Sequence, residues 1–393
     1  MNATTVLATR YGRRLQTPDP AADPALGQSL SQGAAGIALW HVENARCGAG
    51  SWEPVKAWLA AGARADVTAT DSACLSYGAP ALAFVLHAAG ADGTARDRLD
   101  AATAALAHRR VAAGRARIRS GALPAFAEYD LLHGLTGIGL HLLHHAPGDD
   151  ALAAVLSYLV ALTRPVTVHG EQTPGWWCVH DPARHYTPGG HANFGMAHGI
   201  TGPLALLAQA ARRGILVEGQ MEAVSTLTDW FDRWRQEGEG GPWWPETITR
   251  AEMATGRPSG SGSGRPSWCY GIPGISRALQ LAALATADTG RQEAAENALA
   301  ACLADAGQLG RITSTGLCHG MAGLFQTVWR TAQDARTPDL SVAADRLGTV
   351  LMGQRAESDP GLLEGAAGQA LALATAARGR PPASGWDAYL LIS

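Results

Sequence analysis

Two of the six cysteines stand in the same local sequence. Cys269 lies in WCYGIPG and Cys318 in LCHGMAG, so each thiol comes two residues before the first glycine of a Gly-x-x-Gly motif, and His319 follows Cys318 directly. Two thiolates and one imidazole are donors that zinc prefers, and a three-ligand set leaves the fourth position open, as catalytic zinc sites do. The alternative is that both cysteines are small buried hydrophobic residues. Because they share one register, the pattern favours a catalytic zinc site made of Cys269, Cys318 and His319.

Two further residues near such glycines could move a proton. His198 comes one residue before Gly199, and Asp130 comes four residues before Gly134. An imidazole exchanges protons near neutral pH, and a carboxylate can orient it or stabilise its charged form. His133 has the same position relative to its glycine as His198, so it is a rival for the proton-transfer role. The alternative for His198 is a helix-start residue that only bonds to the backbone.

The other cysteines and several other histidines lack this context. The cysteines expected only to pack are Cys47, Cys74, Cys178 and Cys302. Three histidines at helical spacing before a proline are expected to interact favourably with a helix C-terminus, namely His141, His144 and His145. Three more, in an irregular segment, are expected to be solvated, namely His180, His185 and His191.

The Gly-x-x-Gly motif recurs seven times along the chain, and its copies must position these residues. The first glycines are Gly33, Gly78, Gly134, Gly199, Gly271, Gly320 and Gly365. Only the second copy departs from the motif, with Ala81 where the second glycine should stand. Repetition of this kind indicates a repeat architecture.

Each copy opens an apolar helical stretch, and a more polar helical pattern follows it. The clearest polar stretches span 54–62, 95–112, 220–235 and 290–306. One inner and one outer helix per copy predict about fourteen helices. The first and last copies look like the middle ones, whereas open solenoids have atypical ends. We therefore predict an all-α, seven-fold α/α toroid that forms a single domain over residues 1–393.

Two segments interrupt the helical pattern. Residues 165–195 contain Val-Thr-Val among prolines and glycines, which predicts a small inserted subdomain that contains β-structure. Residues 255–266 are rich in Gly, Ser and Pro and are expected to form a flexible loop.

Composition excludes several classes of protein. The chain has 31 Lys+Arg and 34 Asp+Glu, a net charge of −3, which argues against a nucleic-acid partner. No stretch of 18 apolar residues and no signal peptide are evident, so neither a transmembrane segment nor secretion is expected. Six cysteines over 393 residues do not make a disulfide framework. A cytoplasmic protein is expected, associated with a membrane only through a partner complex.

The sequence around these glycines resembles the lanthionine synthetase C-like family. The motifs that carry the resemblance are RPSWCYG from Arg265, CHG from Cys318, AHG from Ala197 and Tyr129-Asp130. The resemblance runs from Gly33 to the closing GWDAYLL, so it covers nearly the whole chain. It departs at Ala81 and at His133, where the family commonly has an acidic residue.

The resemblance implies an α/α toroid with one Zn²⁺ per chain, held by Cys269, Cys318 and His319. It further implies proton handling by Asp130 and His198. The substrate-side residues that it implies are Arg265 and Tyr270. The bacterial cyclases of the family also carry a small β-containing insertion in the place of residues 165–195.

The function that the resemblance implies is that of a free-standing bacterial lanthipeptide cyclase. Such an enzyme adds peptide Cys thiols to dehydroalanine or dehydrobutyrine in a dehydrated precursor peptide, forming lanthionine or methyllanthionine thioether rings. The implied partners are that peptide, a separate dehydratase and an exporter. The alternatives are a family member that adds glutathione or another thiol to dehydroamino acids in proteins, and a non-catalytic scaffold for a peptide or dehydratase. A toroidal glycosidase is disfavoured because no rim of paired carboxylates is evident.

Overall fold

The computed structural model describes residues 15, 17–19, 22–168, 170–260 and 262–393. Residues 1–14, on which part of the expectation of no signal peptide rests, lie outside the described residues. The chain divides into two compact units. The first unit comprises Met1–Thr103, Ile312–Leu391 and Ser393, and it holds motif copies six, seven, one and two. The second unit comprises Ala104–Arg311 and Ile392, and it holds copies three to five.

Each copy of the motif leads into a buried helix. These inner helices are α3 (Ala34–Arg46), α5 (Ala79–Ala89), α8 (Leu135–His145), α10 (Thr201–Arg212), α13 (Ile272–Thr286), α16 (Met321–Asp334) and α18 (Ala366–Arg378). The first glycine of the motif is the N-cap residue in every copy but the fourth, where α10 starts two residues after Gly199. The predicted inner helices are therefore confirmed.

The second glycine of the motif is required by close backbone packing. A Cβ atom added to Gly323 would lie 1.8 Å from the carbonyl oxygen of Leu317, and one added to Gly368 would lie 1.9 Å from that of Leu362. In both copies the carbonyl belongs to the residue six positions earlier. Because no side chain can occupy that space, the glycine lets the helix start lie against the loop that precedes it.

Outer helices follow the inner ones. They are α4 (Glu53–Gly62), α6 (Thr94–Arg119), α9 (Asp150–Leu162), α11 (Gln220–Trp234), α14 (Thr289–Ala304) and α17 (Asp339–Gly353). The four predicted polar stretches agree with these bounds within two residues, except that α6 continues to Arg119. After α18 the chain ends in a 3₁₀ helix, η1 (Trp386–Leu390). None of the helices in the described part of the chain has both the length and the apolar character needed to cross a bilayer.

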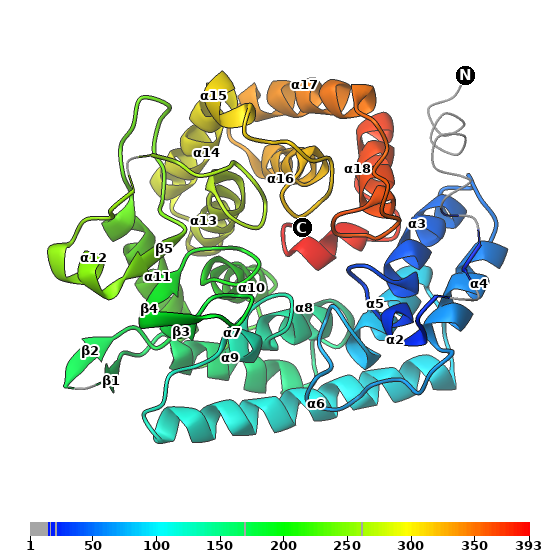
Figure 1. Cartoon of the computed structure of the whole chain (residues 1–393), viewed down its shortest axis with the longest axis horizontal. Coiled ribbons are helices and arrows are strands. Elements are labelled where there is room, and N and C mark those ends of the chain that lie inside the picture. Colours follow the sequence, from blue (N-terminus) through cyan, green and yellow to red (C-terminus); the bar gives the residue numbers. More distant parts are fainter. Residues whose placement is uncertain (1–14, 16, 20–21, 169, 261) are drawn as a thin grey trace. The chain divides into compact units, whose positions relative to one another are not determined.

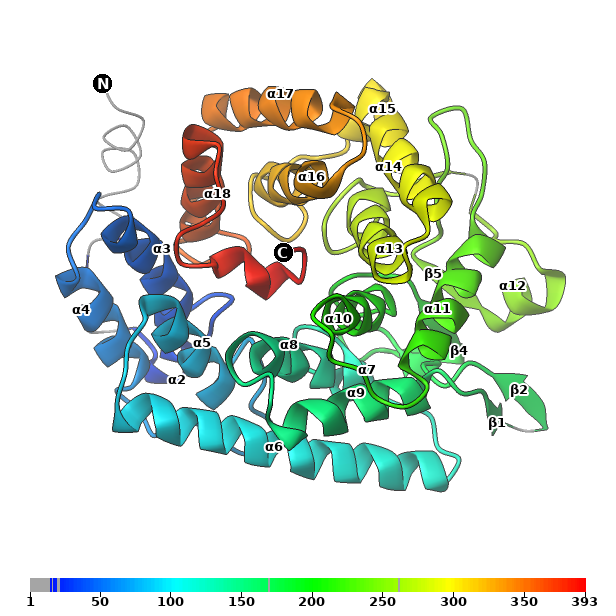
Figure 2. The same cartoon turned by 180° about the vertical axis from the view of Figure 1, so that it is seen from behind.

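Inner helices pack against one another in repeat order within each unit (Figures 1 and 2). In the first unit α16 contacts α18, α18 contacts α3, and α3 contacts α5. In the second unit α10 contacts both α8 and α13. The contact between α18 and α3 joins the last copy of the motif to the first, as the expectation of a closed arrangement requires.

One backbone hydrogen bond recurs between successive copies. The amide three residues before the first glycine of one copy donates to the carbonyl two residues before the first glycine of the next copy. These bonds run from Leu30 to Ser76 (2.9 Å), Leu131 to Ala197 (3.1 Å), Met196 to Cys269 (2.8 Å), Leu317 to Leu363 (2.8 Å) and Leu362 to Ser31 (2.9 Å). The residue two positions before the first glycine, which is Cys269 in the fifth copy, therefore contacts the loop of the preceding copy. Residues at equivalent positions in the motif make equivalent contacts.

The irregular segment forms small antiparallel sheets in the second unit. Strand β1 (Val166–Val168) pairs with β2 (Glu171–Thr173). A second sheet has the order β3-β4-β5, with β3 (Cys178–His180), β4 (Tyr186–Asn193) and β5 (Thr247–Thr249). The predicted insertion therefore receives one strand from a later part of the chain. Short helices in the connections are α2 (Pro24–Gly27), α7 (Phe126–Tyr129), α12 (Arg250–Thr255) and α15 (Ala306–Leu309).

Candidate active site and metal ligands

Asp130 is a buried carboxylate at the start of α8. It follows α7 directly and is fully inaccessible to solvent. Its Oδ1 atom accepts hydrogen bonds from the backbone amides of His133 at 2.7 Å and Gly134 at 2.8 Å. These amides belong to the positive end of the helix, where a carboxylate is stabilised. The position of Asp130 four residues before the glycine is what allows this capping.

The other oxygen of Asp130 fixes His198. His198 Nδ1 donates to Asp130 Oδ2 at 2.6 Å, so Nε2 is the ring nitrogen left for proton exchange. Burial by itself would raise the pKa of the Asp130 carboxyl, but hydrogen bonds from His133 and His198 and the charges of these imidazoles outweigh it, and the pKa lies below its usual value. Asp130 is therefore ionised at neutral pH. The bond from Leu131 to Ala197 holds the two loops together.

A cavity of about 380 Å³ opens beside this pair. The lining residues are Ala125, Phe126, Ala127, Asp130, His133, His180, Pro182, Arg184 and His198. The hairpin between β3 and β4 supplies three of them, so the inserted sheet forms one wall of the cavity. Sequence reasoning missed this wall because nothing in the local sequence relates residues 180–184 to the loop at Asp130.

The three histidines of the inserted segment do not share one environment. The side chain of His185 is 80% exposed and pairs with Asp181, as expected of a solvated residue. His180 is half-buried and lines the cavity. The expectation is wrong for His191, which is 4% exposed, because β4 places its ring against Phe126, with ring centroids 5.8 Å apart. Burial, with the nearby charge of His180, lowers the pKa of His191.

Tyr270 and Arg265 flank Cys269 in the same loop. The Tyr270 hydroxyl oxygen accepts a hydrogen bond from Asn193 Nδ2 at 2.8 Å, which leaves the hydroxyl hydrogen available to another acceptor. Burial raises the pKa of the Tyr270 phenol, so the group stays neutral. The Nε atom of Arg265 is buried and has no hydrogen-bond partner among the described residues. Both side chains therefore keep unused donors.

Cys269 lies within the second unit and is 5% exposed. Its carbonyl accepts the bond from Met196, two residues before His198, so its loop is joined to the loop of the proposed proton donor. The Ser267 hydroxyl lies 3.5 Å from its Sγ atom.

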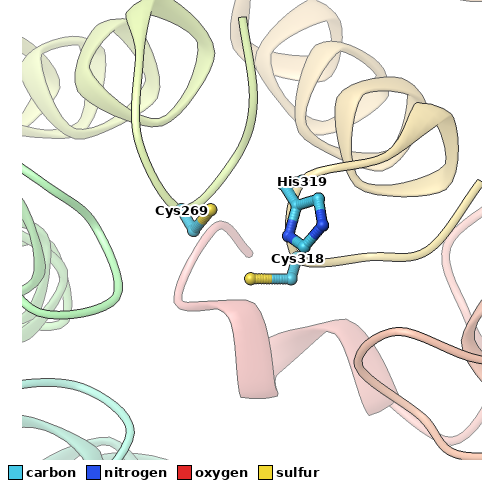
Figure 3. A group of neighbouring side chains, drawn as sticks. All are labelled: Cys269, Cys318 and His319. Atoms are coloured by element: carbon cyan, nitrogen blue, oxygen red, sulfur yellow. The ribbon is translucent and has the colours of Figure 1, made fainter. Parts of the chain in front are cut away.

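Cys318 and His319 lie in the first unit, in the loop that leads into α16 (Figure 3). The Cys318 amide donates to the Leu363 carbonyl at 2.9 Å. His319 Nδ1 lies 2.9 Å from Glu364 Oε1. Glu364 stands directly before the first glycine of the seventh copy, as His319 does in the sixth. Aligning the copies could have identified it, since neighbouring copies place this position side by side.

Cys269, in the second unit, and Cys318 and His319, in the first, each offer one side-chain atom that could bind a metal ion (Figure 3). Two thiols and one imidazole match the chemistry of zinc ligands, and a carboxylate on the imidazole is a common support for such a ligand. None of the six cysteines, all of which the structure describes, takes part in a disulfide. Burial raises the pKa values of Cys178 and Cys302 to about 12 each, so these two thiols are unreactive at neutral pH.

Comparisons with known proteins support the family that the sequence motifs resemble. The model of the lanthionine synthetase C-like protein family matches residues 24–391. Nisin biosynthesis protein NisC of Lactococcus lactis subsp. lactis is 26% identical over 262 residues, which cover 63% of this chain. The match spans 60% of the length of that relative. A solved structure of nisin cyclase superposes with a TM-score of 0.77 and 22% identity, covering 99% of this chain and 96% of the other.

The structural match confirms the predicted fold class, a seven-fold α/α toroid with a small β-containing insertion. The family match covers all seven copies of the motif and every residue proposed for the site. The chain belongs to the lanthionine synthetase C-like protein family.

Proposed function

We propose that this protein is a lanthipeptide cyclase. It adds the thiol of a peptide cysteine to the β-carbon of dehydroalanine or dehydrobutyrine in a dehydrated precursor peptide. The C–S bond forms as the C=C π electrons move toward the carbonyl, giving an enolate. A proton is then added to the α-carbon, so the thiol proton lost is balanced by the proton gained, and the product has the mass of the substrate.

The observation that carries this proposal is the Asp130–His198 pair beside an open cavity. Because the buried Asp130 carboxylate binds Nδ1 of His198, the other ring nitrogen, Nε2, remains available to exchange a proton with a ligand in the cavity. A scaffold that only docks a peptide has no need of such a pair. Family membership supports the same reaction class.

Cys269, Cys318 and His319 are the residues that would hold one zinc ion. Zinc, when bound, would lower the pKa of a substrate thiol, which is otherwise about 8.5, so that the sulfur is a thiolate at neutral pH. Glu364 supports this assignment, because its carboxylate fixes the Nδ1 side of the His319 ring. The equivalent positions of Cys269 and Cys318 in successive copies support it independently. In other pairs of successive copies, the loops that carry this position are joined by a backbone hydrogen bond.

His198 supplies the proton to the α-carbon, and it can first accept the proton of the peptide thiol. Asp130 holds the ring in one orientation and stabilises its positive charge when it is protonated. Arg265 and Tyr270 stabilise the developing negative charge on the enolate oxygen. Their unused donors support this role, because a buried N–H without a partner gains most from a new acceptor.

The remaining assignments follow from this function. The substrate is the dehydrated precursor peptide, and a separate dehydratase supplies it. We place the protein in the cytoplasm, with an exporter in the same biosynthetic complex. The toroid is one domain over residues 1–393, and residues 165–195 are its inserted subdomain.

A synthetic peptide with one dehydroalanine and one cysteine tests the proposal. The zinc-loaded protein should close the thioether ring, which is followed as loss of thiol alkylation at unchanged mass. His198→Asn should slow closure by about 10²–10⁴-fold, the usual contribution of a general acid–base group, while keeping its zinc. Addition of free glutathione in place of ring closure would favour the thiol-transfer alternative. No reaction in the presence of bound peptide would favour a scaffold.

A further inference from the structure

The hairpin over the cavity presents a cation that its own residues do not neutralise. Arg184 lies in the turn between β3 and β4, and its backbone amide donates to the Asp181 carbonyl at 2.9 Å. The Asp181 carboxylate is engaged by His185, whose backbone amide and Nδ1 lie 2.8 and 2.9 Å from its two oxygens. Within the described part of the chain, the guanidinium of Arg184 has neither a hydrogen bond nor an ion pair.

The backbone of this turn fixes the place of Arg184. Its φ angle is +69°, in the left-handed region that an arginine adopts only when its surroundings hold it there. His180 Nδ1 donates to the Asp181 carbonyl at 2.7 Å, which braces the start of the same turn. The turn is therefore a defined structure, and its cation is held at the cavity wall.

The cavity offers cationic groups to a ligand and has no free anion. Arg184 brings a guanidinium to the cavity, and the imidazoles of His133 and His180 also line it. The only carboxylate among the lining residues is Asp130, and protein donors already engage both of its oxygens. Phe126 and Pro182 supply apolar surface between these groups. A carboxylate held by a planar guanidinium suits this combination better than a cationic or neutral group does.

We propose that Arg184 is a specificity-determining residue that binds a carboxylate of the substrate peptide close to the reacting residue. The proposal rests on the proposed function, since it names a feature of the peptide that enters the same cavity. The carboxylate can belong to an acidic side chain or to the C-terminus of the peptide, and the two sources can be separated by synthesis.

Four peptides that share one dehydroalanine and one cysteine provide the test. Either Glu or Gln follows the dehydroalanine, and the C-terminus is either a free acid or an amide. For the wild-type protein, kcat/KM for ring closure should be about two- to fivefold higher for one carboxylate-bearing peptide than for its neutral partner, as expected of an exposed ion pair. Added salt should reduce this preference. Preference for Glu identifies an acidic side chain, and preference for the free acid identifies the C-terminus.

Variants then assign the preference to one residue. The ratio of kcat/KM for the preferred carboxylate-bearing peptide to that for its neutral partner should fall to about one in Arg184→Gln and below one in Arg184→Glu. The Arg184→Glu variant should instead favour a peptide that carries Lys. Arg119→Glu is the matched control, because Arg119 is exposed and does not line the cavity, so its ratio should stay as in the wild type. Equal ratios in wild type and Arg184→Glu would overturn the proposal.

A binding measurement keeps this test independent of catalysis. Fluorescently labelled peptides with Ser in place of dehydroalanine cannot react, and their dissociation constants should show the same preference and the same loss in Arg184→Gln. Failure of ring closure with a retained binding preference would reject the proposed function and leave the carboxylate site standing. Ring closure with no preference in rate or binding would reject only the carboxylate site.

Discussion

The imidazole ring of His133 lies parallel to that of His198, with centroids 5.6 Å apart and an interplanar angle of 12°. The Nδ1 atoms of the two rings are 3.5 and 2.6 Å from the same oxygen of Asp130. The side chain of His133 is 53% exposed and that of His198 is 15% exposed. His133 therefore supports the ring of His198 by stacking, while the shorter bond to Asp130 orients it.

Replacing His133 tests this support. His133→Phe keeps an aromatic ring against His198 and should retain activity within about threefold. His133→Ala removes the ring and should slow ring closure by about two- to tenfold, the range of a stacked aromatic pair. The backbone amide that holds Asp130 is unaffected in both variants. A larger loss in His133→Phe than in His133→Ala would instead assign His133 a direct role in proton transfer.

Asp130 should make the stability of the protein depend on acid. Its pKa is lowered in the folded state, so the folded chain binds this proton less readily than the unfolded chain. The stabilisation is complete above the unfolded pKa of about 3.9 and is lost as the pH falls through the lower folded value. Urea midpoints of wild type and Asp130→Asn should differ at pH 7 and converge below about pH 4. A constant difference across this range would contradict the assignment.

Cysteine variants should separate the metal ligands from the packing thiols. Purified wild-type protein should contain about one zinc per chain, and Cys269→Ala or Cys318→Ala should lose it. Cys178→Ala and Cys302→Ala are matched controls, since both thiols are fully buried and have pKa values of about 12. Metal analysis by mass spectrometry measures the content. Zinc retained in Cys269→Ala would remove Cys269 from the ligand set.

Glu364 should strengthen zinc binding by Cys269, Cys318 and His319. Glu364→Gln removes the charge next to His319 Nδ1 while keeping the size of the side chain. Loss of such a supporting carboxylate typically weakens metal binding by about 10- to 100-fold. Competition with a chelator of known zinc affinity measures the change. Glu222→Gln, in the first turn of α11, serves as a control, and an equal loss there would show a general electrostatic effect.

The second glycine of the motif should tolerate no side chain. Gly323→Ala would place a Cβ atom 1.8 Å from the Leu317 carbonyl oxygen, so the helix start or the loop must move. We expect this variant to lower the free energy of unfolding by about 2 kcal/mol or more. Gly353→Ala is the control, because nothing lies within 4 Å of the added atom, and its stability should not fall. Urea denaturation measures both.

The sequence predicted the parts of the fold that local rules determine. Gly-x-x-Gly followed by an apolar run identified the inner helices, because the tight contact at the second glycine, seen in five of the copies, involves only residues of the same copy. Asp130 and His198 were proposed for the site for a related reason, since each stands a few residues before the first glycine of a copy.

Long-range contacts could not be predicted in this way. Strand β5 joins the inserted sheet from more than fifty residues beyond β4, and a three-residue strand has too little pattern to be recognised. His191 was expected to be solvated, although it lies in the last four residues of β4, which are all buried, and its ring packs against Phe126. The position of Arg184 in the cavity wall likewise depends on where the β3–β4 hairpin packs, and this long-range packing cannot be predicted from the local sequence.

The junction between the last and first copies determines when the protein can finish folding. The amide of Leu362 bonds to the carbonyl of Ser31, and the hydroxyl of Tyr389 lies 2.9 Å from those of both Ser31 and Ser76. These contacts span more than three hundred residues, so they close a very long loop and must form late. During synthesis the first copy keeps one edge unpaired until the seventh copy and Tyr389 have left the ribosome. Until residues 362–389 have emerged, that edge is open to wrong pairing, and truncation of the chain before Leu362 would leave it open.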